Sequence, residues 1–310
     1  MDNHDTFRKR VEYAAVWLMF RVLSVLPRRA AIGMTTVIVE VMAIFAHKAR
    51  ATVFTNFEIA FPESTREQRV SWWRECRRNL GRVIAEMSRF DRMSAADVQA
   101  IADLTVEGVS PFAYIRQRAG DRGAVWITAH LGNWEMAAFG VSALYEPLAY
   151  MARTIENLRV QDLIRRYRAA HGNSPIDKTN SLRPALKLLR AGGSVAILAD
   201  VNTVGREGVF VPFFGKQACA TIGPAVLAIR ANAVLFPIFC VWDKSLGKYK
   251  LIYSEPFEPA STGDVESDIL ATTAALTRSI EDAIRQYPGQ WLWTHKRWKE
   301  QPPGSPPVYG

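Results

Sequence analysis

Short apolar runs alternate with amphipathic segments from residue 104 to residue 285. Apolar positions three or four apart are typical of helices, and short apolar runs are typical of strands. The predicted strands cover 104–107, 124–129, 148–152, 194–199, 234–241 and 250–253, and the predicted helices cover 134–144, 158–170, 182–191, 221–231 and 266–285. This alternation predicts an α/β fold, a mixed sheet flanked by helices, with functional groups at the strand ends.

The segment from residue 51 to residue 102 is helical by pattern. A capping box at Ser64–Glu67, after Pro62, predicts a helix start, and Ser94–Asp97 repeats the pattern. We therefore expect an N-terminal helical segment over 1–50, a main domain over 51–300 whose part 51–102 is helical and whose part 103–300 is α/β, and a loose tail over 301–310.

The first 46 residues contain two apolar stretches, 13–20 and 30–46. Arg21 closes the first and Glu40 interrupts the second, so neither is a clean run of the roughly 20 apolar residues that a spanning helix needs. We expect 11–46 to form helices that lie in or on a membrane, and the alternative is a buried helical hairpin of a soluble domain. The side chains expected to face anionic headgroups are Arg8, Lys9, Arg10, Arg28 and Arg29.

Composition narrows the class of protein. Of the 310 residues 49% are hydrophobic, which excludes a disordered or low-complexity chain. The net charge of +9 (39 − 30) favours an anionic partner such as an acidic membrane, an acidic carrier or nucleic acid. The three cysteines, Cys76, Cys219 and Cys240, are widely spaced and predict neither a disulfide framework nor a cysteine-type zinc site.

Candidate chemistry lies in the segment from Ala124 to Glu135, which reads AVWITAHLGNWE. A strand ends, His130 follows, and Glu135 comes five residues later, about 140° round a regular helix. The two side chains can meet only if His130 lies in a turn and Glu135 lies on the following helix. Gly132 would let that turn bend, and Asn133 is a good N-cap.

In this arrangement Glu135 would orient the imidazole of His130, whose other nitrogen would take a proton from a hydroxyl. The hydroxyl of an acceptor molecule can then be the nucleophile, without a nucleophile from the protein. The alternative is a capping histidine beside an unrelated surface glutamate. The sequence contains neither a dinucleotide-binding nor a P-loop motif, and we expect no cofactor and no metal.

The segment HLGNWE, residues 130–135, resembles the H-x4-D/E motif of glycerolipid acyltransferases, in the form typical of bacterial lipid A late acyltransferases. Further segments resemble family elements in the same order: NFEIAFPE (56–63), RTIEN (153–157), ADVN (199–202), VPFFG (211–215), TIGP (221–224) and QWLWTHKRW (290–298). The resemblance covers roughly residues 50–300.

This resemblance implies transfer of a fatty acyl group from an acyl carrier protein or coenzyme A thioester to a glycolipid hydroxyl. The expected acceptor is a lipid A precursor at the cytoplasmic face of the inner membrane, with a mannosylated phosphatidylinositol or another glycolipid or phospholipid as the alternative. A non-catalytic lipid-binding membrane protein is a further alternative. Binding to nucleic acid is not expected, because no recognised module is present and the charge is spread along the chain.

Several residues are predicted to bind substrate. Arg153 would bind phosphate or the oxyanion, or form a surface salt bridge, and Asn157 would serve the site or fix a local turn. Asp200 would hold Arg153 or the acceptor, or cap a turn. Phe213 and Phe214 would line an acyl groove or pack in the core.

The last of these segments, 290–298, mixes tryptophan rings with cations and suits a membrane interface. A second catalytic histidine at His295 is the less favoured interpretation of this segment.

Overall fold

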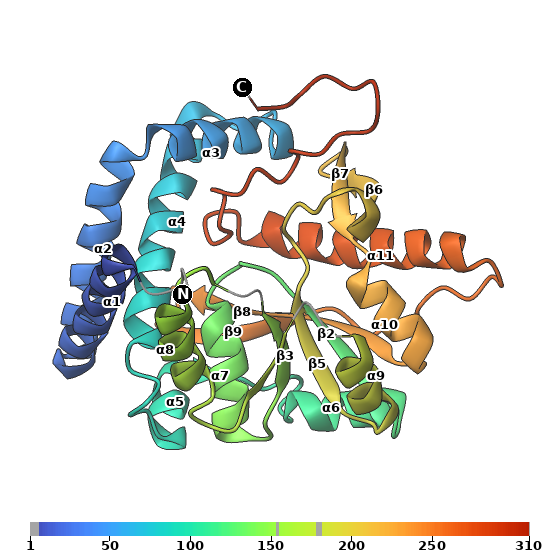
Figure 1. The fold of residues 1–310 in the computed structure, drawn as a ribbon, viewed down its shortest axis with the longest axis horizontal. Helices are drawn as coiled ribbons and strands as arrows, with labels where there is room; N and C mark the ends of the chain where they lie inside the picture. The colour runs from blue at the N-terminus through green and yellow to red at the C-terminus, as the bar shows by residue number, and fades with distance from the viewer. Residues whose placement is uncertain (1–5, 153–154, 178–181, 310) are drawn as a thin grey trace.

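The predicted alternation of helices and strands is present in a computed structural model that describes residues 6–152, 155–177 and 182–309 (Figure 1). The helices are α1 (Phe7–Val25), α2 (Arg28–Phe45), α3 (His47–Ala60), α4 (Arg66–Met87), α5 (Ala95–Ile101), α6 (Pro111–Ala119), α7 (Trp134–Leu144), α8 (Leu158–Arg168), α9 (Leu182–Arg190), α10 (Gly223–Ala231) and α11 (Val265–Gln286). The strands are β1 (Ala102–Asp103), β2 (Ala124–Thr128), β3 (Ala149–Ala152), β4 (Ser174–Asp177), β5 (Ser194–Leu198), β6 (Gly208–Phe213), β7 (Lys216–Thr221), β8 (Val234–Asp243) and β9 (Lys248–Tyr253).

Seven strands form one sheet in the order β1-β9-β8-β2-β5-β3-β4, and β6 and β7 form a separate hairpin. Neighbours in the large sheet are parallel, except that β8 and β9 are antiparallel. The sheet is therefore mixed and mostly parallel, as predicted. Because β2 and β5 are parallel neighbours with Thr128 opposite Leu198, the residues that follow them meet at the same edge.

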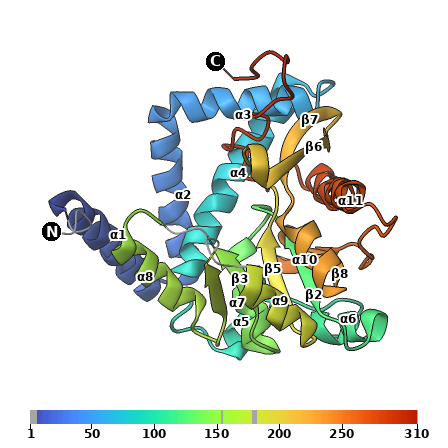
Figure 2. The ribbon, with the colours of Figure 1, turned by 45° about the vertical axis from the view of Figure 1, so that its right-hand side comes forward.

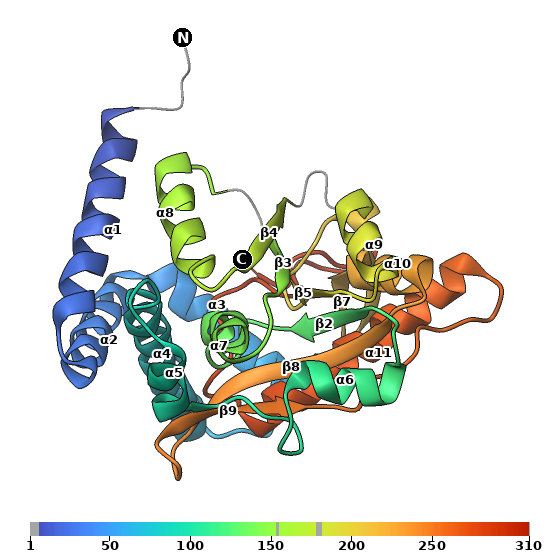
Figure 3. The same ribbon diagram turned by 90° about the horizontal axis from the view of Figure 1, so that it is seen from below.

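Helices cover both faces of the sheet, because the strands are apolar on both sides. Val125 and Ile127 of β2 pack into a cluster with residues of α9, α10 and α11, whereas Trp126 between them packs with residues of α5, α6, α7 and α8. This alternation with period two places a hydrophobic core on each face. Figure 3 shows α6 and α7 on the face opposite α11.

The local structure differs from the predicted one in several places. The capping box of α4 is formed by Thr65 and Gln68, one residue later than predicted. The β6–β7 hairpin was not predicted, although Phe214 and Gly215, with φ of 52° and 74°, form the two-residue turn with positive φ that joins hairpin strands.

The N-terminal helices expose apolar side chains rather than forming a buried hairpin. Helix α1 lies beside α8, and α2 packs along α4 (Figures 1, 2 and 3). The exposed large apolar residues of these two helices are Phe7, Val11, Trp17, Leu18, Val22 and Val25 on α1 and Val37, Val41, Met42, Ile44 and Phe45 on α2. The prediction that Arg28 faces headgroups is wrong, since its guanidinium pairs at 2.6 Å with the buried carboxylate of Glu86.

Among the described residues, no single helix is both long and apolar enough to cross a bilayer. Helices α2 and α3 pass together on length and composition, across a bend of 93° between them (Figure 2).

Candidate active site

His130 lies two residues beyond β2, in the turn that leads into α7. Gly132 in this turn has φ of 63°, and Asn133 caps α7 by accepting the Met136 N–H at 3.0 Å, as predicted. The fully buried α4 residue Asn79 donates to the Gly132 carbonyl at 2.6 Å. The turn is therefore fixed by the helix that follows it and by α4.

Asp200 follows the neighbouring strand β5 and binds His130 twice. Its Oδ2 accepts the backbone N–H of His130, and its Oδ1 lies 2.9 Å from Nδ1 of the same residue. The Trp291 indole N–H donates to Oδ2 at 2.8 Å. Asp200 is only 1% exposed, so these three donors stand in for the water that a buried carboxylate loses.

The protonation states follow from this contact. Burial raises the pKa of Asp200. The contacts of Asp200 with His130 and Trp291 and the charge of His295 outweigh burial and hold this pKa far below its usual range. Asp200 is thus an acceptor, so Nδ1 of His130 carries the hydrogen and Nε2 is free to take a proton. Burial lowers the pKa of His130, yet the carboxylate of Asp200 outweighs it and the pKa lies above its ordinary value.

The prediction that Glu135 holds His130 is wrong in this structure. Glu135 is the second residue of α7, and its carboxylate pairs with both guanidinium arms of Arg168, at 2.8 Å from Nε and 2.5 Å from Nη2. The Trp134 indole N–H also donates to it at 3.2 Å. Glu135 affects His130 through its charge, which adds to the rise in the pKa of His130 after the larger contribution of Asp200.

The other predicted binding residues have different surroundings. Arg153 lies outside the described residues. Asn157 caps α8 and donates to the Lys9 carbonyl of α1 at 2.8 Å, which fits the alternative in which it fixes local structure. Phe213 and Phe214 are 1% and 6% exposed and belong to a core cluster, so they pack in the core instead of lining a groove.

His295, which the sequence interpretation did not favour as a site residue, lies next to His130 and Asp200. Its ring centroid lies 4.9 Å from that of His130, and one ligand atom each of His130, Asp200 and His295 lie within 4.8 Å of one another. Two imidazoles and a carboxylate are a donor set that suits a metal such as zinc. In this structure three hydrogen bonds, two from His130 and one from Trp291, already engage the two oxygens of Asp200.

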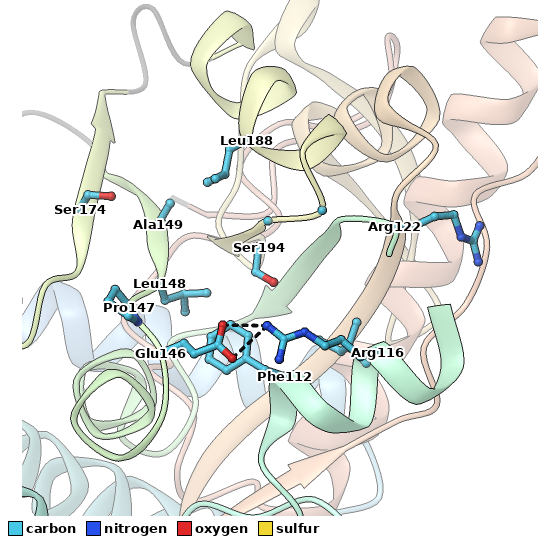
Figure 4. Close-up of a pocket in the computed structure, with 13 residues that line it drawn as sticks. Phe112, Arg116, Arg122, Glu146, Pro147, Leu148, Ala149, Ser174, Leu188 and Ser194 are labelled. Atoms are coloured by element: carbon cyan, nitrogen blue, oxygen red, sulfur yellow. Dashed lines mark hydrogen bonds and ion pairs between the residues drawn. The ribbon is translucent and has the colours of Figure 1, made fainter. Parts of the chain in front are cut away.

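A cavity of about 190 Å³ lies at the opposite edge of the sheet, at the amino ends of β3, β4 and β5 (Figure 4). Figure 4 shows Arg116 and Glu146 paired across it, at 2.9 Å. No predicted site residue lines this cavity. The candidate groups His130 and Asp200 lie instead at the carboxyl edge of the sheet, where the side chain of His130 remains 21% exposed.

Gly132 gives a direct test of the turn that carries His130. A Cβ at this position would lie 2.0 Å from the Cys240 carbonyl oxygen, and φ is positive. We expect Gly132→Ala to lower the free energy of unfolding by more than about 3 kcal/mol, because backbone strain and a backbone clash add. Urea denaturation followed by tryptophan fluorescence measures this difference.

The matched control is Gly33→Ala in α2, where an added Cβ meets no atom within 4 Å. We expect this variant to be neutral or more stable by up to about 1 kcal/mol, from helix propensity. Equal stability of the two variants would contradict the tight fit assigned to the turn.

The known proteins that this chain resembles are acyltransferases. A family model described as bacterial lipid A biosynthesis acyltransferase matches residues 3–300. The chain is 26% identical over 267 residues to the lipid A biosynthesis palmitoleoyltransferase of Escherichia coli K12 (86% of this chain, 83% of that protein) and 29% identical over 273 residues to its lipid A biosynthesis lauroyltransferase (86% and 84%).

A phosphatidylinositol mannoside acyltransferase of Mycolicibacterium smegmatis is 33% identical over 184 residues. That alignment covers 57% of this chain and 57% of the relative, so the chain spans little more than half of that relative's length.

Proposed function

The chain belongs to the bacterial lipid A biosynthesis acyltransferase family, and from this premise we propose that it moves a fatty acyl group from a thioester to a hydroxyl of a glycolipid. The donor is an acyl carrier protein or coenzyme A thioester. The acceptor is a lipid A precursor, reached at the cytoplasmic face of the inner membrane. The pairing of His130 with buried Asp200 is the observation that carries this proposal.

The reaction uses the free Nε2 of His130. As the acceptor oxygen attacks the thioester carbonyl, its proton passes to Nε2, and the imidazolium that forms is stabilised by Asp200. The carbon–oxygen bond forms, the carbon–sulfur bond breaks, and the proton moves from Nε2 to the departing sulfur. The protein supplies no covalent nucleophile in this scheme.

The roles of the remaining predicted residues differ. Glu135 supports the site by holding Arg168, whose side chain is 28% exposed beside the catalytic turn. Arg153 stays a prediction as a ligand for phosphate or for the oxyanion.

The exposed apolar faces of α1 and α2 support binding at a membrane surface, where both substrates carry acyl chains. The net charge of +9 is of the sign that anionic lipid and an acidic carrier attract. Both features fit an enzyme that binds to one leaflet and draws its acceptor from it.

The lipid A acceptor is favoured over a mannosylated phosphatidylinositol because the alignments with lipid A acyltransferases extend over 86% of the chain. The experiment incubates the purified protein in anionic vesicles with each acceptor, and with acyl carrier protein or coenzyme A thioesters as donors. Mass spectrometry of the lipids then detects an acceptor that is heavier by one acyl chain.

Acylation of the lipid A precursor supports the proposal, and acylation of only the mannoside would replace the acceptor. Binding of lipid with no turnover from either donor would contradict the enzymatic proposal and favour a lipid-binding protein. Loss of the same lipid species from cells that lack the protein, and its return on re-expression, would identify acceptor and chain length together.

A further inference from the structure

The chain that follows α11 lies along the catalytic turn (Figure 1). The Leu292 N–H donates to the His130 carbonyl at 2.9 Å, and the Gly132 N–H donates to the Gln290 carbonyl at 3.0 Å. Residues 290–292 thus pair with the backbone of residues 130–132, and the residues after them come close to the reacting imidazole.

Buried Asn56 holds the backbone at His295 in place. Its side-chain amide donates to the Trp293 carbonyl at 2.8 Å and to the His295 carbonyl at 2.7 Å. Its own oxygen accepts the Tyr309 hydroxyl at 2.5 Å. Asn56 of α3 thus fixes the backbone of His295, and with it the point from which the ring extends, before any substrate binds.

The ring of His295 combines two features that suit a reacting group. Its centroid is 4.9 Å from that of His130, with the two planes inclined at 61°. Its Nε2 is buried and lacks a hydrogen-bond partner among the described residues. Other buried polar atoms of the described residues also lack a partner, Asn133 Nδ2 and Arg297 Nε among them. Nε2 of His295 differs from these in belonging to the ring that lies against the imidazole of His130, where a ligand from outside the chain would satisfy it.

The pKa values of the two imidazoles are shifted in opposite directions. The groups that act on His295 are Asp200, His130 and Arg297. Burial lowers the pKa of His295, His130 and Arg297 lower it further, and Asp200 opposes them without restoring it. Since the pKa of His130 is raised, the proton of the reaction goes to His130 and His295 stays neutral. A neutral imidazole is a hydrogen-bond donor that can polarise a carbonyl without giving up its proton.

We propose that His295 is a second catalytic residue, whose Nε2–H donates a hydrogen bond to the thioester carbonyl oxygen as that oxygen becomes the oxyanion. The inference rests on the proposed acyl transfer and adds an electrophilic group to it. The hydroxyl oxygen attacks the carbonyl carbon, its proton goes to His130, and the electron pair of the C=O bond moves onto the oxygen that His295 holds. Return of that pair expels the thiolate, which takes the proton from His130.

Three variants test this role: His295→Leu, His295→Gln and His295→Asn. The amide nitrogen of glutamine reaches the position of Nε2, whereas that of asparagine reaches the position of Nδ1. Loss of one oxyanion donor costs about 10²–10³-fold in kcat, so we expect that loss for His295→Leu with KM changed by only a few-fold. We expect glutamine to restore part of the rate and asparagine to restore less.

The readouts separate catalysis from structure. The Tm of His295→Leu should equal or exceed that of the wild type, because leucine removes a buried nitrogen that has no partner. The acidic limb of the pH–rate profile should stay where it is, since His130 remains the base. A destabilised protein whose remaining folded fraction keeps its kcat would overturn the proposal.

The outcomes also separate this inference from the proposed function. If the wild type acylates its acceptor and all three variants keep kcat within about twofold, His295 has no role in the chemistry and the acyltransferase proposal stands. If the wild type itself turns over no thioester, the proposed function fails first. Equal losses in the glutamine, asparagine and leucine variants, with folding intact, would contradict donation from Nε2.

Discussion

His130→Ala is expected to lower kcat for acyl transfer by about 10²–10⁴-fold, the usual contribution of a general base. The imidazole is the group whose Nε2 is free while Nδ1 is engaged by Asp200. Its side chain is 21% exposed, so a substrate hydroxyl can reach it. The loss should fall on kcat more than on KM, because the proton moves only in the transition state.

His47→Ala is the matched control, since His47 begins α3 and is exposed. Its kcat should equal that of the wild type. Circular dichroism and thermal unfolding of both variants show whether the fold is intact. Near-normal turnover by folded His130→Ala would refute the assignment of His130 as the base.

The sequence predicted the elements that its periodicity marks strongly. The helix 134–144 has the bounds of α7, and the strand 194–199 differs from β5 by one residue, because a run of buried apolar residues and a capping asparagine define them. The predicted strand 104–107 was misplaced, since the observed β1 covers only Ala102–Asp103. Two residues at the edge of a sheet carry too little pattern to be located.

The site was predicted in part, because pairing between strands is not visible in local spacing. Both His130 and Asp200 were placed at strand ends. That β2 and β5 are neighbours follows only from the sheet order, which brings together residues 70 positions apart. Glu135 was chosen as the partner because it is near in sequence, but Arg168 at the end of α8 engages its carboxylate. Topology therefore decided which acid meets the base.

Asp200→Asn is expected to lower kcat by about 10²–10⁴-fold and to move the acidic limb of the pH–rate profile to lower pH. Burial lowers the pKa of His130 and the carboxylate of Asp200 raises it, so removal of the carboxylate leaves burial as the dominant influence and the pKa falls. The acidic limb reports deprotonation of His130, so it moves to lower pH as the pKa of His130 falls. Asparagine also offers an N–H to Nδ1, which favours the tautomer with the proton on Nε2, the wrong one for a base. Measurement of kcat and of kcat/KM from pH 5 to pH 9 gives both effects.

Glu135→Gln is the matched comparison, because it removes the other nearby carboxylate while keeping its shape. It too should lose activity, since it weakens the pair with Arg168 beside the turn. Its acidic limb should move less than that of Asp200→Asn, because the charge of Glu135 contributes less to the pKa of His130. The displacement of the limb is thus the deciding quantity, and the loss of rate is not. A larger displacement for Glu135→Gln would mean that His130 turns from Asp200 to Glu135 during the reaction, which would restore the pairing that the spacing of the H-x4-E motif first indicated.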